Sequence, residues 1–513
     1  MNNQSESKNT GMVVKGASIT FVGMVYQLVL SFVSGIIITR TIGSENYGIF
    51  SLARTLGETL SVFTKLGFDI GLVRYFGEKS SQNHDKINAH FLKLVLITVS
   101  ILSILPVLLI WGGGGTAIEN YIYQYEHFAD VLAVMVLLVP LISIVQVISG
   151  AFRGVFQIKP RVYGELFMQP TIRLIIILML FYVGWNIWAA IVGTVLSYVV
   201  VLVYMLILMN KHFFRCITGD MKEVGFQKAT MKELVSVGKY SVVISLTVAV
   251  AMLLAKTDVI MLGFFVTADK IGQYVVIQLV VGLIIFVNAA LNQMVAPMLA
   301  KLHRENKKPE MKKLINQHTR WVMIASLPIF IIIAQYGIHI IAIFGEDFVV
   351  QTLVLPILAL SQLTVAVLSS AGFILSMTGK HKLEFYTMAF ALICNVILNL
   401  MLIPEMGIEG AALSTLISII LANLLRIHQV YRIYGFYPVD KVLVVPFFLG
   451  VASMYCVVLL NQYLLNMDGL IEAVTNSVVF MVAYSILVYK FTLTHEDREL
   501  LSKVKAKLLR RAA

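Results

Sequence analysis

The chain has 513 residues, of which 58% are hydrophobic and 13% are charged, and its formal net charge is +12. Apolar runs of about 18 or more residues recur along nearly its whole length, which excludes a soluble globular protein and predicts a polytopic membrane protein. The surplus of Lys and Arg falls mostly in the connections between these runs, as membrane topology and anionic lipid require. No basic and aromatic nucleic-acid module interrupts them, so we expect no nucleic-acid partner.

Basic clusters and turn residues divide the apolar sequence into spans, which predict an all-α fold. Fourteen transmembrane helices are expected, near residues 13–38, 48–75, 91–111, 128–152, 163–183, 187–210, 236–264, 272–299, 319–344, 352–377, 385–403, 408–431, 442–463 and 470–491. The first span is longer than the apolar core of a signal peptide and has no clear small-residue cleavage site after it. We therefore expect it to remain attached as an anchor.

The second expected span, residues 48–75, is unusual because it carries charged residues. On a helical wheel, four of them fall within an arc of about 60° and extend roughly 22 Å along the axis: Arg54, Glu58, Lys65 and Asp69. Each ionised residue near a helix centre costs about 2.5–3.5 kcal/mol, so this stripe is expected to face a bundle interior or a water-filled cavity. Alternatively, the two i,i+4 pairs simply neutralise each other and fix the span against its neighbours.

Other spans also bring polar side chains to mid-membrane depth: Gln169, Asn288, Asn292, Gln293, Asn395 and Asn399. Hydrogen bonds between helices explain these amides as well as ligand contacts do. Arg173 differs, because the nearest acid on its helix, Glu165, is two turns away, and this favours a cavity or an anionic ligand beside it, although a Glu or Asp of another span would also serve. Lys256 and Asp258 lie near the outer end of the seventh span, where snorkelling to the membrane surface is an alternative explanation.

Lys and Arg are concentrated in every second connection, as in 211–235 and 301–313, whereas 112–127, 345–351 and 403–410 contain neither. The positive-inside rule then places both termini in the cytoplasm. The three cysteines, Cys216, Cys394 and Cys456, form no CxxC spacing, so we expect no disulfide and no metal. The segment 372–381 has the wrong spacing for a phosphate-binding loop, and no cofactor is expected.

The sequence also indicates an internal duplication. Gly48 in "SENYGIF" and Gly272 in "ADKIGQY" are 224 residues apart, and two alanine pairs, 189–190 and 411–412, are 222 apart. This offset spans six helices, an even number, which predicts two parallel repeats. The expected organisation is a six-helix lobe over 1–210, a cytoplasmic linker over 211–235, a second six-helix lobe over 236–432, and two more helices with a basic cytoplasmic tail over 433–513.

Four segments resemble the polysaccharide transporter family, the Wzx-type flippases of lipid-linked oligosaccharides: "RTIGSENYGIFSLA" at 40–53, "LGFDIGLVRYF" at 66–76, "KTDVIMLGFFVTADKIGQY" at 256–274 and "APMLAKL" at 296–302. The likeness extends over about residues 12–432, and the last two spans match the fourteen-helix members. Gly48, Gly67, Arg74 and Tyr75 match recurrent positions of the family. Its superfamily also contains the MATE drug exporters and the MurJ-type lipid II flippases.

The resemblance implies two lobes that form a V around a central cationic cavity, which opens alternately to either side of the membrane. It implies a polyprenyl-pyrophosphate-linked oligosaccharide as substrate, moved from the cytoplasmic to the outer leaflet of the inner cell membrane for a surface polysaccharide such as O-antigen. The headgroup would enter the cavity while the polyprenyl tail stays among the membrane lipids. Coupling to H⁺ or Na⁺, and a complex with a polysaccharide polymerase or glycosyltransferases, are further expectations.

The side-chain chemistry agrees, since Arg and Lys suit pyrophosphate, and amides and hydroxyls suit sugars. The predicted substrate-binding residues are Arg54, Lys65, Arg173, Asn288 and Asn292. A second group is predicted to compensate charge, so that the anion is not bound too tightly, or to exchange a coupling ion: Glu58, Asp69 and Asp258.

Three alternatives remain open. A MATE-like cation-coupled drug exporter would show an acid-rich, aromatic chamber, whereas base predominates at depth here. A membrane glycosyltransferase or polymerase usually has an extended outer loop with acids or His, and the longest outer connection here is the Gly-rich 112–127, which ends in Glu126 and His127. A scaffold or regulator of cell-wall assembly is the third. We expect a transporter and not an enzyme.

Overall fold

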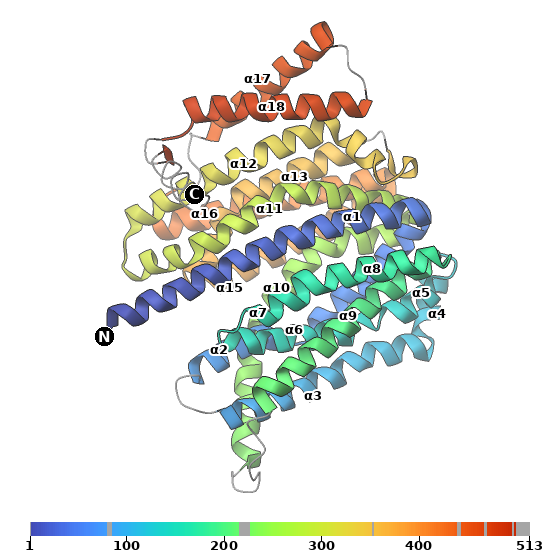
Figure 1. Ribbon diagram of the computed structural model, residues 1–513, viewed down its shortest axis with the longest axis vertical. Coiled ribbons are helices and arrows are strands. Elements are labelled where there is room, and N and C mark those ends of the chain that lie inside the picture. Colours follow the sequence, from blue (N-terminus) through green and yellow to red (C-terminus); the bar gives the residue numbers. More distant parts are fainter. Residues whose placement is uncertain are drawn as a thin grey trace, which may run out of the picture. The chain divides into compact units, whose positions relative to one another are not determined.

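A computed structural model describes residues 2–79, 85–214, 226–350, 353–438, 443–465, 469–494 and 497–498. These residues are helical throughout apart from short connections (Figure 1). The helices are α1 (Asn2–Thr64), α2 (Phe68–Lys79), α3 (Asp85–Leu109), α4 (Gly115–Tyr121), α5 (Phe128–Met135), α6 (Leu138–Gly154), α7 (Lys159–Arg161), α8 (Gln169–Tyr182), α9 (Ile187–Met209), α10 (Phe226–Phe265), α11 (Ala268–Arg304), α12 (Lys308–Ala342), α13 (Val354–Leu368), α14 (Ser370–Met377), α15 (His381–Met406), α16 (Ile408–Tyr434), α17 (Val444–Leu460) and α18 (Gly469–Phe491). Shorter helical turns are η2 (Ile110–Gly114), η3 (Val162–Met168), η4 (Asn210–Phe214), η6 (Glu346–Phe348) and η8 (Asn461–Leu465).

Within the described residues, twelve helices are long and apolar enough to span a membrane, and the bent pair of α13 and α14 adds a thirteenth. The predicted all-α, polytopic membrane fold is confirmed, whereas the predicted count of fourteen is not reached. One of the twelve, Ile19–Thr64, is 46 residues long, about 69 Å, or roughly twice the hydrocarbon thickness. It contains a non-helical residue, Gly43 (φ 75°, ψ 176°), so α1 consists of two helices, which hold the first expected span and the start of the second.

The chain forms two compact units. Unit 1 comprises Met1–Val276, Phe344–Val350 and Phe385–Ser418, and unit 2 comprises Ile277–Ile343, Gln351–Glu384 and Ile419–Ala513. This division does not follow the expected lobe boundaries, which remain a prediction. Much of the expected linker, 215–225, and of the expected basic tail, 499–513, lies outside the described residues.

The second expected span is not one continuous helix, so the prediction of a single charged stripe is wrong. Helix α1 ends at Thr64, and α2 begins only at Phe68. Between them, Leu66 (φ 49°) and Gly67 (φ 69°) have left-handed backbone conformations, which glycine adopts without steric cost. A Cβ at Gly67 would lie 2.5 Å from the backbone oxygen of Ser241, so α10 also approaches this turn too closely for a larger residue.

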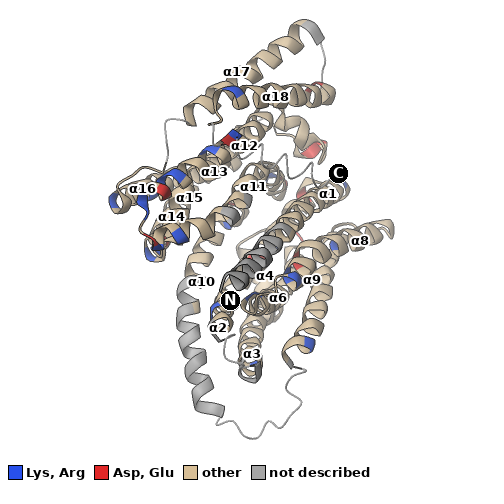
Figure 2. Ribbon diagram, turned by 60° about the vertical axis from the view of Figure 1, so that its left-hand side comes forward, with Lys and Arg blue, Asp and Glu red and all other residues tan. Residues whose placement is uncertain are grey.

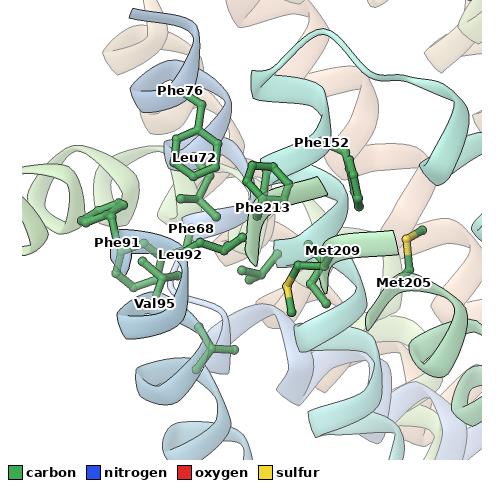
Figure 3. Close-up of a cluster of buried hydrophobic side chains, with 14 of the residues drawn as sticks. Phe68, Leu72, Phe76, Phe91, Leu92, Val95, Phe152, Met205, Met209 and Phe213 are labelled. Carbon is green, nitrogen blue, oxygen red and sulfur yellow. The ribbon is translucent and has the colours of Figure 1, made fainter. Parts of the chain in front are cut away.

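The apolar core of unit 1 lies where α2, α3, α6 and α9 meet (Figure 3). Phe68, Leu72 and Phe76 of α2 belong to one cluster with side chains from the other helices, among them Phe91 and Phe152. Because lipid tails are as apolar as these side chains, close packing rather than escape from water stabilises such a contact. A core of unit 2 joins the ends of α11, α12, α14 and α16.

Small residues allow the closest helix contacts of unit 1. Gly150 and Gly154 of α6 form a G-x-x-x-G pair, and Cβ atoms there would collide with the α2 backbone at Asp69 and Leu72. Gly48 of α1 and Gly272 of α11 form a second contact. A Cβ added to Gly48 would lie 3.0 Å from the backbone nitrogen of Gly272, and a Cβ added to Gly272 would lie 3.2 Å from that of Gly48. These two glycines are the ones that the sequence duplication pairs.

The end of the described chain is hydrogen-bonded to α12 within unit 2. Asp497, whose side chain is 1% exposed, accepts hydrogen bonds from Arg320 Nη2 (2.5 Å), Trp321 Nε1 (3.0 Å) and Gln317 Nε2 (3.1 Å). The hydroxyl and backbone nitrogen of Thr494 donate two more. Burial alone would raise the pKa of the Asp497 carboxyl, but these hydrogen bonds outweigh it and lower the pKa below its ordinary value.

Candidate functional site

The charged residues in the first half of the second span form an ion pair that a third residue joins. Arg54 Nε donates to Glu58 Oε1 at 2.7 Å, as the i,i+4 spacing predicts. The other carboxylate oxygen, Oε2, lies 3.1 Å from Nζ of Lys256, which comes from α10. The Arg54 and Lys256 side chains are each 33% exposed and Glu58 is 17% exposed, so a ligand can reach this group.

Arg173 of α8 belongs to the same group. It interacts electrostatically with Arg54 and Glu58, and with the hydroxyls of Tyr47 and Tyr198. Its Nη2 donates to Ser34 Oγ at 2.6 Å. Its Nε is buried and has no acceptor among the residues that the structure describes. Arg173 is therefore held in place on one side and has a free hydrogen-bond donor.

We call Arg54, Glu58, Arg173 and Lys256 the cation cluster. Three cations and one carboxylate give it a formal charge of +2, although the helices around it carry few charged residues (Figure 2). On the lenient insertion scale, two uncompensated charges cost about 5–7 kcal/mol in the membrane centre. Such a charge requires water or an anion beside it. Guanidinium forks and an ammonium group are the donors that bind phosphate oxygens in proteins.

Lys65 and Asp69, on either side of the break, form a different and more enclosed pair. Lys65 Nζ donates to Asp69 Oδ2 (3.0 Å) and to Gln146 Oε1 (2.6 Å), and both charged side chains are buried. Arg153 Nη2 donates to the backbone oxygen of Asp69. Both i,i+4 pairs predicted from the sequence thus form, but this one connects the break to α6 and lies about 16 Å along the chain from Arg54.

Asp258 is surrounded by neutral hydrogen-bond donors. Tyr274 donates to Oδ2 at 2.8 Å, and the Nδ2 atoms of Asn399 and Asn395 donate to Oδ1 at 3.0 and 3.2 Å. The hydroxyl of Thr415 also donates to Oδ2. Because the Asp258 residue is only 2% exposed, snorkelling does not explain it. A carboxylate with this many neutral partners can exist with its charge unpaired, with a proton, or with a small cation.

The predicted amides Asn288 and Asn292 lie in unit 2. Asn288 Nδ2 donates to Ser369 Oγ at 2.9 Å. The Oδ1 atoms of both amides are buried and accept no hydrogen bond from the described residues. They therefore retain acceptors for a donor such as a sugar hydroxyl. Nothing is described for the side chain of Gln293, and Gln169 donates to Ser197 instead.

Sequence reasoning missed that Lys256 pairs with Glu58. The two residues are almost 200 positions apart, and their helices, α10 and α1, are not neighbours along the chain. It also missed Tyr198, which lies in the largely apolar helix α9. The one available signal was the surplus of base over acid at membrane depth, which requires acids to be shared among several cations.

A match to a known protein family identifies the family of this chain. Residues 13–303, more than half of the chain, match the family described as "Polysaccharide biosynthesis protein". The chain belongs to this polysaccharide biosynthesis family. A relative in Haloferax volcanii, named "Probable low-salt glycan biosynthesis flippase Agl15", is 24% identical over 413 residues, which cover 80% of this chain and 81% of the relative.

Two solved structures show that the fold is shared more widely. The lipid II flippase MurJ, in an inward closed conformation, superposes with a TM-score of 0.72 at 15% identity, covering 94% of this chain and 99% of its own. An inward-facing multidrug resistance MATE family transporter has a TM-score of 0.64 at 13% identity, with 82% and 98% covered. The protein is thus a polytopic membrane member of the polysaccharide biosynthesis family with a MurJ- and MATE-like fold.

Proposed function

We propose that this protein is a flippase that moves a polyprenyl-pyrophosphate-linked oligosaccharide from the cytoplasmic to the outer leaflet of the inner cell membrane. The observation that carries the proposal is the cation cluster, a +2 charge in unit 1 with two partly exposed cations. A pyrophosphate diester has two negative charges and balances it. Membership of the polysaccharide biosynthesis family and the flippase name of the Haloferax relative agree with such a substrate.

Each cation has a defined role in this proposal. Arg54 and Lys256 offer their donors to the phosphate oxygens from α1 and α10, and Arg173 adds the free Nε at its buried position. Arg is better suited than Lys to bind two oxygens at once, whereas Lys provides a point charge. Asn288 and Asn292 are proposed to contact sugar hydroxyls. The polyprenyl tail stays in the lipid, which avoids the cost of transferring it to water.

The coupling ion, H⁺ or Na⁺, is proposed to bind at Asp258. This carboxylate is nearly inaccessible and its four partners are neutral. Binding of one positive charge would therefore change the local charge of unit 1 by a full unit without breaking an ion pair. A carboxylate of this kind inside a membrane protein is a functional candidate on general grounds.

The proposed topology rests on the distribution of Lys and Arg, and the proposed protein partners rest on the family resemblance. Both termini are proposed to lie in the cytoplasm, as the positive-inside rule predicts. Glycosyltransferases that build the oligosaccharide, and a polymerase that uses it on the other side, are the proposed protein partners. A MATE-like drug exporter is less well supported, because drugs of that class are cations and the cation cluster would repel them. We propose no enzymatic activity for the chain.

The experiment is a flipping assay in proteoliposomes with a fluorescent polyprenyl-pyrophosphate oligosaccharide. Arg54→Ala, Arg173→Ala and Lys256→Ala are expected to lose at least about tenfold in rate, since a charge-assisted hydrogen bond contributes about 1.5–3 kcal/mol. Lys301→Ala, at a cation whose side chain is 69% exposed, is the matched control and should flip normally. Normal flipping by all three cluster variants would contradict the proposal, and so would an inactive wild type.

A further inference from the structure

Glu58 holds the cation cluster together through both of its oxygens. Oε1 accepts from Arg54 and Oε2 lies beside Lys256, so the carboxylate bridges a residue of α1 and a residue of α10. Two oxygens of a phosphate group would contact the same two cations in the same way. The cation cluster therefore already contains an anionic group at the place where the proposed substrate needs to bind.

The bridge leaves donors unused, whereas the buried pair of Arg426 and Glu384 does not. In unit 2, Arg426 donates from Nε and Nη2 to Glu384 and from Nη1 to Asn423, so the guanidinium is engaged on all three nitrogens. Arg54 donates to Glu58 from Nε alone, and its Nη1 and Nη2 have no acceptor among the described residues. The Arg426 and Glu384 side chains are also only 8% and 9% exposed.

A phosphate at the cation cluster would compete with Glu58 for its partners. Arg173 interacts with it from α8 and Tyr198 from α9, in addition to Arg54 and Lys256. Once a phosphate takes Arg54 and Lys256, Glu58 loses both direct partners and faces a second anion at short range. Like charges this close repel strongly where water is scarce. The carboxylate and the phosphate therefore compete for the same two cations.

We infer that Glu58 is a displaceable counter-ion of the cation cluster, which the substrate's phosphate replaces on binding and which recaptures Arg54 and Lys256 when the substrate leaves. This inference rests on the proposed function. It gives Glu58 a role in release: without a competing carboxylate, three cations would hold the pyrophosphate too tightly for turnover. An interaction that stabilises only the substrate-bound state does not increase the rate of a transport cycle, because it slows release.

The test uses Glu58→Gln, which keeps the shape of the side chain and removes its charge. The full-length protein in nanodiscs is titrated with farnesyl diphosphate, a short polyprenyl diphosphate, and flipping is measured with the fluorescent substrate. The variant is expected to bind farnesyl diphosphate with at least a tenfold lower Kd and to flip at least tenfold more slowly. Glu165→Gln is the matched control, because Glu165 also pairs with an Arg at i,i+4 spacing, Arg161, outside the cluster.

The outcomes separate this inference from the proposed function. If wild type binds farnesyl diphosphate and Glu58→Gln binds it with equal or higher Kd, Glu58 is a fixed structural counter-ion and the inference is overturned, while the proposed function survives. If wild type binds no diphosphate, both are overturned. Glu58→Asp guards against misfolding, because it keeps the charge: a Kd near that of wild type, together with tighter binding by Glu58→Gln, supports competition by the carboxylate.

Discussion

Replacing Gly48 with alanine tests the close contact between α1 and α11 in unit 1. An ideal Cβ at Gly48 would overlap the backbone oxygen of Ala268 and lie 2.7 Å from its carbonyl carbon and 3.0 Å from the nitrogen of Gly272. Ordinary contacts begin near 3.5 Å, and the added carbon would lie 1.8 Å from the Ala268 oxygen, so one helix has to move by about 1.7 Å. Overpacking of a well-packed core costs about 1–3 kcal/mol, and because backbone atoms cannot rotate away, we expect about 3 kcal/mol.

The assay is thermal unfolding of the purified protein in detergent, followed by size-exclusion chromatography after heating. Gly48→Ala is expected to lower the unfolding temperature by several degrees. Gly112→Ala is the matched control, since Gly112 has a negative φ of −77° and no atom within 4 Å of the added carbon. Equal unfolding temperatures for the two variants would refute the close contact. A large loss in the control alone would contradict the space seen around Gly112.

Three further predictions follow. Asp258→Asn is expected to abolish any dependence of flipping on an H⁺ or Na⁺ gradient while leaving diphosphate binding intact; persistent gradient dependence would place the coupling ion elsewhere. Lys65→Ala is expected to cost about 3–5 kcal/mol of stability, because it leaves the buried Asp69 without its cation. The free energy of binding farnesyl diphosphate should change less than the free energy of unfolding, and a larger change in binding would make Lys65 a direct ligand. Asp497 has a lowered pKa in the folded protein, so the stability it provides is present above its unfolded pKa of about 3.9 and is lost as the pH falls through the lower folded value. Unfolding temperatures of wild type and Asp497→Asn should therefore differ at pH 7 and begin to converge only below about pH 4, and a constant difference would contradict the ion-paired state.

Sequence reasoning succeeded where the signal is local. Long apolar runs predict membrane helices because lipid leaves the backbone no other way to satisfy its hydrogen bonds. The pairs of Arg54 with Glu58 and Lys65 with Asp69 also follow from helical spacing, and both are present. The helical wheel failed between these pairs, because it assumes unbroken geometry and Gly67 permits a left-handed turn.

The parts that could not be predicted depend on distant segments. The partners of Asp258 come from α11, α15 and α16, so no window of sequence contains them. Nor does any local pattern reveal that Lys256 shares Glu58 with Arg54, since that depends on how two helices cross. The sequence could indicate that buried polar groups need partners, but not which of many candidates the fold brings together.

The break at 65–67 has a mechanical consequence. It separates the short helix α2 from α1, and Gly150 and Gly154 of α6 allow α2 to pack closely against α6. Lys65, at the break, donates to Asp69 of α2 and to Gln146 of α6. The preceding helix, which holds Arg54 and Glu58, is bonded to the same α6, because Ser143 donates to the backbone oxygen of Ser61 at 3.2 Å and shares a 2.8 Å hydrogen bond with the Thr64 hydroxyl. Because α6 is bonded to both sides of the break, it fixes the angle between α2 and the part of α1 that carries Arg54 and Glu58.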